Sequence, residues 1–168
     1  MNLEFRITSV LVGRIRADLR RPHRFAFERV GFISARPATT ASGLTLLAIE
    51  YHPVADEDYV DDPSVGAMIG PAAMRKALQF AYKGDVSMLH VHMHEHAGPP
   101  EFSRVDLREY PKFVPDFFNV RPRLPHGAIL LSHDELTGLI WPCRGAQPQR
   151  LDEVIEIGAP LRIFRRMS

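Results

Sequence analysis

The sequence predicts an α/β domain in which helices sandwich a mixed β-sheet. The chain has 168 residues, of which 45% are apolar and 24% are charged, as expected for one domain with an ordinary core. Segments with strand patterns are interspersed with two or three helical segments, in no strict alternation. We therefore expect a single domain over residues 3–168.

The first half of the chain is expected to supply three strands and a helix. Residues 3–7 alternate as a short strand, and residues 10–19 carry apolar side chains at helical spacing. Residues 25–33 are aromatic and β-branched, which favours a strand. Residues 44–54 are almost continuously apolar, which is typical of a buried central strand.

A second helix is predicted to begin at Pro71, because proline suits the first helical position, and to close at Gly84. Residues 86–96 alternate as a strand, and Ser103 is typical of the N-cap of a third helix that runs towards Tyr110. Further strands are expected at 128–132, 138–142, 154–157 and 161–164.

Charge and cysteine content narrow the possible partners and compartment. Lys and Arg number 21 against 20 for Asp and Glu, so net charge gives no reason to expect nucleic acid or an anionic membrane as partner. Cys143 is the only cysteine, which excludes an internal disulfide and a thiolate zinc cage. No signal peptide or run of 18 apolar residues is present, and we expect a cytoplasmic, unanchored protein.

Four of the eight histidines lie at alternating positions of one predicted strand, His90, His92, His94 and His96. Alternate residues of a strand share one face. Packing gives no reason to place an imidazole at each of these positions, whereas a metal ion does. Two histidines two residues apart can bind one ion from the same strand.

Asp106 is the candidate third ligand. A helix capped by Ser103 places Asp106 in its first turn, facing back towards the end of the histidine strand. Ser103 and Asp106 also fit an ordinary capping box, which taken alone would be the simpler interpretation. The histidines immediately before them favour a metal site.

The run from His94 to Asp106 resembles the signature of the JAMM (MPN-plus) metalloprotease family, His-x-His, a short loop, then Ser-x-x-Asp. The commonest family spacing has seven residues between the second His and the Ser, whereas this chain has six after His96 or eight after His94. The resemblance implies a Zn²⁺ ion held by His94, His96 and Asp106. In the alternative register, His92 and His94 are the two histidine ligands. If His94 and His96 are the ligands, His92 lies one residue pair deeper along the strand and contacts the ligands rather than the ion.

The family also uses an upstream glutamate in a Glu-x-x-Gly pattern, which Glu28 and Gly31 match. Glu50, on the apolar strand, is the competitor. The resemblance covers residues 3 to 142 and implies the MPN fold, which has a cytidine-deaminase-like architecture. It further implies Glu28 as general base and then general acid, and Ser103 as a donor to the oxyanion.

By the same resemblance, the expected substrate is a ubiquitin-like protein or its conjugates, cleaved at the C-terminal amide bond. Activating and conjugating enzymes of the same operon are expected partners, and some such systems serve antiphage defence. Two alternatives remain. One is a metal-binding scaffold like the MPN-minus relatives, and the other is a metal-binding cupin, because His94, His96 and Glu101 form a His-x-His-x₄-Glu pattern. A cytidine-deaminase site fails because Cys143 has no second cysteine.

Overall fold

A computed structural model describes residues 2–24, 26–41, 43–62 and 64–165. Phe25 and the last three residues of the predicted domain lie outside this range. Over the described residues one sheet runs in the order β7-β6-β5-β4-β2-β3-β1-β8-β9. Its strands are β1 (Asn2–Thr8), β2 (Val30–Thr40), β3 (Gly43–Pro53), β4 (Ser87–Met93), β5 (His126–Leu131), β6 (Leu136–Trp141), β7 (Gln149–Arg150), β8 (Glu153–Ile157) and β9 (Arg162–Arg165).

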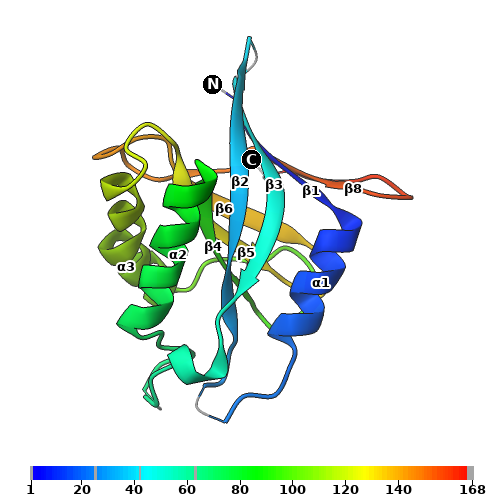
Figure 1. Cartoon of the computed structure of the whole chain (residues 1–168). Helices are drawn as coiled ribbons and strands as arrows, with labels where there is room; N and C mark the ends of the chain where they lie inside the picture. Colours follow the sequence, from blue (N-terminus) through cyan, green and yellow to red (C-terminus); the bar gives the residue numbers. More distant parts are fainter. Residues whose placement is uncertain (1, 25, 42, 63, 166–168) are drawn as a thin grey trace.

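Helices cover both faces of this sheet (Figure 1). Helix α1 (Ser9–Leu19) lies on one side, and α2 (Pro71–Gly84) and α3 (Arg104–Phe113) lie on the other. Short 3₁₀ turns span η1 (Asp56–Asp58) and η2 (Val114–Asn119). The predicted mixed α/β class is confirmed. None of the helices in the described ranges is long and apolar enough to cross a membrane.

The sheet is mixed because β1 pairs in parallel with both β3 and β8, and β4 pairs in parallel with β5. The remaining pairings are antiparallel. The α1 face buries the largest core, which includes Phe5, Ile15, Ile33 and Ile129. The opposite face packs Phe32, Ala77 and Phe117 under α2. Met88 of β4 belongs to this second core.

Several predicted element boundaries differ from the structure, among them the end of β4, which stops at Met93. Helix α2 runs from Pro71 to Gly84 as expected, but Asp85, not Gly84, takes the left-handed conformation at φ 49°. Aspartate is one of the few side chains that tolerate this conformation. Strand β2 begins at Val30, because the chain before it turns outwards and is held by hydrogen bonds from the amides of Phe27 and Glu28 to Gly66.

His126 connects the start of β4 to the loop before β5. The Met88 amide donates to its Nδ1 at 3.0 Å, and its Nε2 lies 3.2 Å from the Arg121 carbonyl. The ring is fully buried, and burial lowers its pKa to about 4, although the hydrogen bond from Nε2 to the Arg121 carbonyl favours the protonated form. A neutral ring fits this position because Nδ1 already accepts a proton donor.

We expect acid to destabilise the fold through His126. In the unfolded chain His126 binds a proton near pH 6.5, and in the folded chain only near pH 4. Its contribution to the free energy of unfolding is therefore fully present above pH 6.5 and is lost as the pH falls towards 4. The full effect is about 3 kcal/mol. Urea unfolding across this range should show a shallower pH dependence for His126→Asn than for wild type. The exposed His133→Asn is the control, and equal slopes in all three proteins would contradict the expectation.

Candidate metal centre

The histidine ladder runs along β4 towards the start of α3. His90 and His92 alternate on the face of β4 that α3 covers, and both are buried. His94 follows Met93, the last residue of the strand, and its amide donates to the Leu131 carbonyl at 2.9 Å. This bond extends the pairing with β5 by one residue, so the His94 ring keeps the direction set by the strand.

Helix α3 begins with a complete capping box. The Asp106 amide donates to Ser103 Oγ at 3.1 Å, and the Ser103 amide donates to Asp106 Oδ2 at 2.7 Å. The capping interpretation and the metal interpretation are therefore not exclusive. The bond from the Ser103 amide fixes the carboxylate of Asp106 in an orientation that also faces the histidines of β4.

Three side chains converge at this point, His92, His94 and Asp106. The two Nε2 atoms lie 3.2 Å apart, Asp106 Oδ1 is 3.4 Å from Nε2 of His92, and Oδ2 is 3.7 Å from Nε2 of His94. A tetrahedral zinc ion with bonds of 2.0–2.2 Å separates its ligand atoms by about 3.3–3.6 Å. The first two separations are close to this range, and the third is slightly longer and involves the other carboxylate oxygen, so small side-chain shifts would let one small cation bind all three residues.

The charge state of the group suits a cation. Burial works against ionisation of Asp106, but hydrogen bonds from His92 and Ser103 outweigh it and hold the pKa of this carboxyl at about 2. Burial, and then the neighbouring His92, lower the pKa of His94. At neutral pH the site thus offers a carboxylate and an unprotonated imidazole at His94, which are the forms that bind metal.

A tyrosine on α3 contacts one of the two histidine ligands. The hydroxyl of Tyr110 lies 2.9 Å from Nδ1 of His92, and both side chains are buried. When Nε2 of a neutral histidine binds a metal, Nδ1 carries the proton, and at His92 that proton would be donated to the phenolic oxygen. Sequence reasoning missed Tyr110, although its position four residues after Asp106 places both on one face of the helix.

His90 lies one pleat deeper and is enclosed by the aromatic rings of Phe32, Tyr110 and Phe113. Burial, and then its neighbour His92, lower the pKa of His90 to about 3. Its Nδ1 has no hydrogen-bond partner among the described residues. His90 therefore contributes a neutral ring to the packing beneath the metal group.

Replacing Tyr110 with Phe is expected to weaken zinc binding by about 10- to 100-fold, because His92 loses the acceptor that orients its ring. Competition with a chromophoric chelator measures this affinity. Tyr82→Phe is the matched control, since Tyr82 is 63% exposed on α2 and belongs to no part of the site. An unchanged affinity in Tyr110→Phe would show that the ring orientation is set by packing alone.

His96 lies outside the group. The chain turns after β4, with the His96 amide donating to the His94 carbonyl at 2.9 Å, so the alternation of side chains stops. The exposed His96 ring places Nδ1 2.9 Å from the Ala97 carbonyl. The geometry favours the alternative pair His92 and His94 over the expected pair His94 and His96.

Glu28 lies just before β2, which is the antiparallel neighbour of β4. The β2–β4 pairing begins at Val30 and His92, and Glu28 precedes it on a bend, where its amide donates to the Gly66 carbonyl. The negative charge of Glu28 raises the pKa values of both His94 and Tyr110, which places its carboxylate within electrostatic range of the site. Glu50, the competitor, is exposed on β3 opposite Ser34 and does not join the group.

No protein-family model and no curated protein matches this chain. What the site can do chemically is therefore inferred from its own residues. Two imidazoles and a carboxylate form a three-ligand set, and a zinc site with three protein ligands leaves a fourth position for water or substrate. Ser103 contacts Asp106 at the start of α3, and the charge of Glu28 acts on His94 from the segment before β2.

Proposed function

We propose that this protein is a zinc-dependent peptidase or isopeptidase of the JAMM type. One observation carries the proposal: Nε2 of His92, Nε2 of His94 and the carboxylate of Asp106 converge at separations of 3.2, 3.4 and 3.7 Å, which are close to those of a tetrahedral metal site. The MPN architecture is part of the proposal and is supported by the mixed sheet with helices on both faces. With this ligand pair, eight residues separate His94 from Ser103, one more than the commonest family spacing.

Zinc bound by these residues would supply the positive charge that makes water acidic near neutral pH and polarises an amide carbonyl. Glu28 accepts the proton of the attacking water and returns it to the departing nitrogen, which is general base and then general acid catalysis. Ser103 Oγ accepts the hydrogen bond of the Asp106 amide, so its own proton stays available. That hydroxyl donates to the oxygen on which negative charge develops.

The proposed substrate is a ubiquitin-like protein, as a precursor or as a conjugate on lysine, cut at its C-terminal amide bond. Its activating and conjugating enzymes are the proposed further partners, and the cytoplasm is the proposed compartment. The resemblance around His94 and Asp106 supports this choice of substrate, together with a site that offers both a proton acceptor and an oxyanion donor for amide cleavage.

The test uses the purified full chain, stripped of metal with a chelator and reloaded with one equivalent of Zn²⁺. The substrates are two fusions of a ubiquitin-like protein ending in glycine, one linear and one joined to lysine through an isopeptide bond. We expect cleavage only after reloading, with one zinc bound per chain. Stoichiometric zinc binding without cleavage of either fusion would favour the scaffold instead. Failure to bind zinc would contradict the metal site itself.

A further inference from the structure

Gly66, in the connection between η1 and α2, contacts the segment that carries Glu28. The amides of Phe27 and Glu28 both donate to the Gly66 carbonyl, at 2.8 and 3.0 Å. Glu28 precedes the first paired residue of β2, so the sheet itself does not fix its backbone. The two hydrogen bonds to one carbonyl hold the peptide units on either side of Phe27, and they thereby set the direction in which the Glu28 side chain leaves the backbone.

The side chain of Glu28 also lies against Gly66. A Cβ added at position 66 would lie 3.0 Å from Oε2 and 3.1 Å from Cδ of Glu28. Both distances are shorter than ordinary van der Waals contacts, so even a methyl group would displace the carboxylate by a few tenths of an ångström. Gly66 is not among the glycines with positive φ, so its backbone would accept alanine without strain. What glycine permits at this position is the close approach of the carboxylate.

The segments that carry Gly66 and Glu28 are joined a second time, through Tyr59. Tyr59 forms an antiparallel β-bridge with Ile69, three residues after Gly66. Its hydroxyl accepts from the Val30 amide at 2.8 Å and donates to the Val30 carbonyl at 3.2 Å, and the ring is buried. Val30 lies two residues after Glu28. Hydrogen bonds at two points therefore hold Gly66 and Glu28 in a fixed relation.

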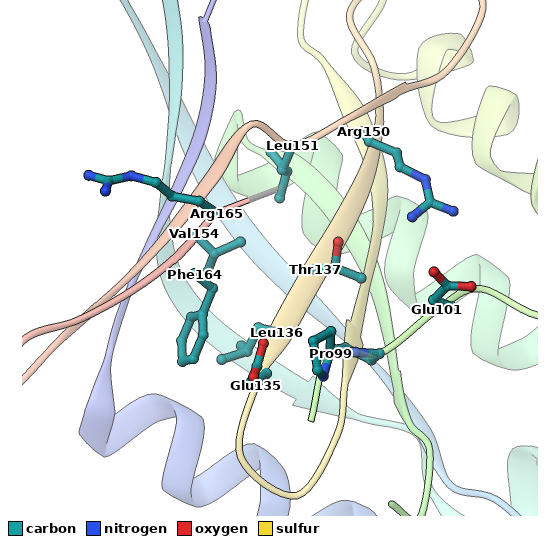
Figure 2. Close-up of a pocket in the computed structure, with 11 residues that line it drawn as sticks. Pro99, Glu101, Glu135, Leu136, Thr137, Arg150, Leu151, Val154, Phe164 and Arg165 are labelled. Carbon is teal, nitrogen blue, oxygen red and sulfur yellow. The ribbon is translucent and has the colours of Figure 1, made fainter. Parts of the chain in front are cut away.

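Gly66 and Glu28 lie outside the groove that Figure 2 shows between β6 and the C-terminal strands. This groove has a volume of about 490 Å³, and Pro99 and Glu101 in its lining come from the loop between β4 and α3. A substitution at position 66 therefore changes the surroundings of the Glu28 carboxylate and leaves the hollow beside that loop as it is.

We propose that Gly66 is a positioning residue for Glu28: its carbonyl orients the backbone, and its missing side chain leaves space for the carboxylate at the place from which it exchanges protons. This inference rests on the proposed function, in which Glu28 accepts the proton of the attacking water. Proton transfer needs donor and acceptor within hydrogen-bond reach, so a displaced acceptor lowers the rate. Gly66 supplies none of the three metal-ligand atoms, so its replacement should leave metal binding unchanged.

The test compares Gly66→Ala with wild type as the zinc-loaded full chain, on the linear and the isopeptide-linked fusions. We expect the rate at saturating substrate to fall by about 10-fold, while KM changes little and zinc content stays at the wild-type level. Gly13→Ala is the matched control, since a Cβ at position 13 meets no atom within 4 Å. If Gly66→Ala cleaves as fast as wild type, the proposal is overturned.

A second pair of variants separates positioning from a general loss of structure. In Glu28→Asp the side chain is one carbon shorter, so the carboxylate no longer reaches a Cβ at position 66. Adding Gly66→Ala to Glu28→Asp should therefore lower the residual rate by less than about twofold, because the two substitutions act on one contact. Equal losses in both backgrounds would show that alanine acts through the fold, and would also overturn the proposal.

The ¹³C signal of the Glu28 carboxyl group gives a readout that does not depend on catalysis. It is assigned by its loss in Glu28→Gln. We expect this signal to move in Gly66→Ala and to stay in place in Gly13→Ala. If the wild type cleaves neither fusion, the proposed function fails and this signal alone decides the inference. A moved signal then supports the placement of the carboxylate by Gly66, and an unmoved signal overturns it.

Discussion

Glu28→Gln is expected to lower the rate of amide cleavage by about 10²- to 10⁴-fold while one zinc ion per chain remains bound. The substitution keeps the size and the hydrogen-bonding shape of the side chain but removes the proton acceptor. None of the three ligand atoms belongs to Glu28, so metal content should not change. Single-turnover cleavage of the fusion substrates and metal analysis of the same sample measure the two quantities.

Glu50→Gln is the matched control for this experiment. Glu50 is also a strand-associated carboxylate, but it is exposed on β3 and lies outside the metal group. Its replacement should leave both cleavage and zinc content at wild-type levels. If Glu28→Gln cleaves as fast as wild type, proton transfer is performed by another group and the role assigned to Glu28 is wrong.

His92→Ala and His96→Ala are expected to differ sharply in metal content. Removing the His92 ring deletes one of the three donors, and zinc affinity should fall by on the order of 100-fold or more. His96→Ala should retain the wild-type affinity, because His96 supplies none of the three ligand atoms and its Nδ1 lies 2.9 Å from the Ala97 carbonyl. Zinc stoichiometry after dialysis against a weak chelator separates the two variants.

This pair of variants also decides between the two registers. Zinc loss in His96→Ala together with retention in His92→Ala would restore the ligand pair expected from the sequence. Because His92 is buried, circular dichroism of the metal-free variants should accompany the measurement. Equal helix content in both shows that any difference in metal content comes from the ligands rather than from the fold.

The sequence predicts the general form of the site well, for reasons that lie in local chemistry. The histidine ladder and the capping box at Ser103 are short-range patterns, and the structure contains the capping box and the ladder as far as His94. Gly31, which singled out Glu28, also has a physical reason. A side chain at this position would lie only 2.4 Å from the ring of Tyr51.

The local sequence pattern could not predict which two histidines join Asp106. Alternation continues through His96 in the sequence, and no turn residue occurs before Gly98. The strand nevertheless ends at Met93, because the extension of its pairing with β5 stops at Leu131 and the chain then turns. Tyr110 was missed for a similar reason: its contact with His92 depends on how α3 packs against β4, which no single segment encodes.

One carboxylate, that of Asp106, both completes the first turn of a helix and faces the two imidazoles. In an unfolded chain Asp106 is far from the two histidines, so the loop between His94 and Ser103 has to close before all three side chains can bind one ion. After the loop has closed, the bound cation stabilises the first turn of α3. A ligand that binds only the native state adds its binding free energy to the free energy of unfolding. Losing the cation would accordingly loosen the start of α3, and fraying of that turn would release the cation.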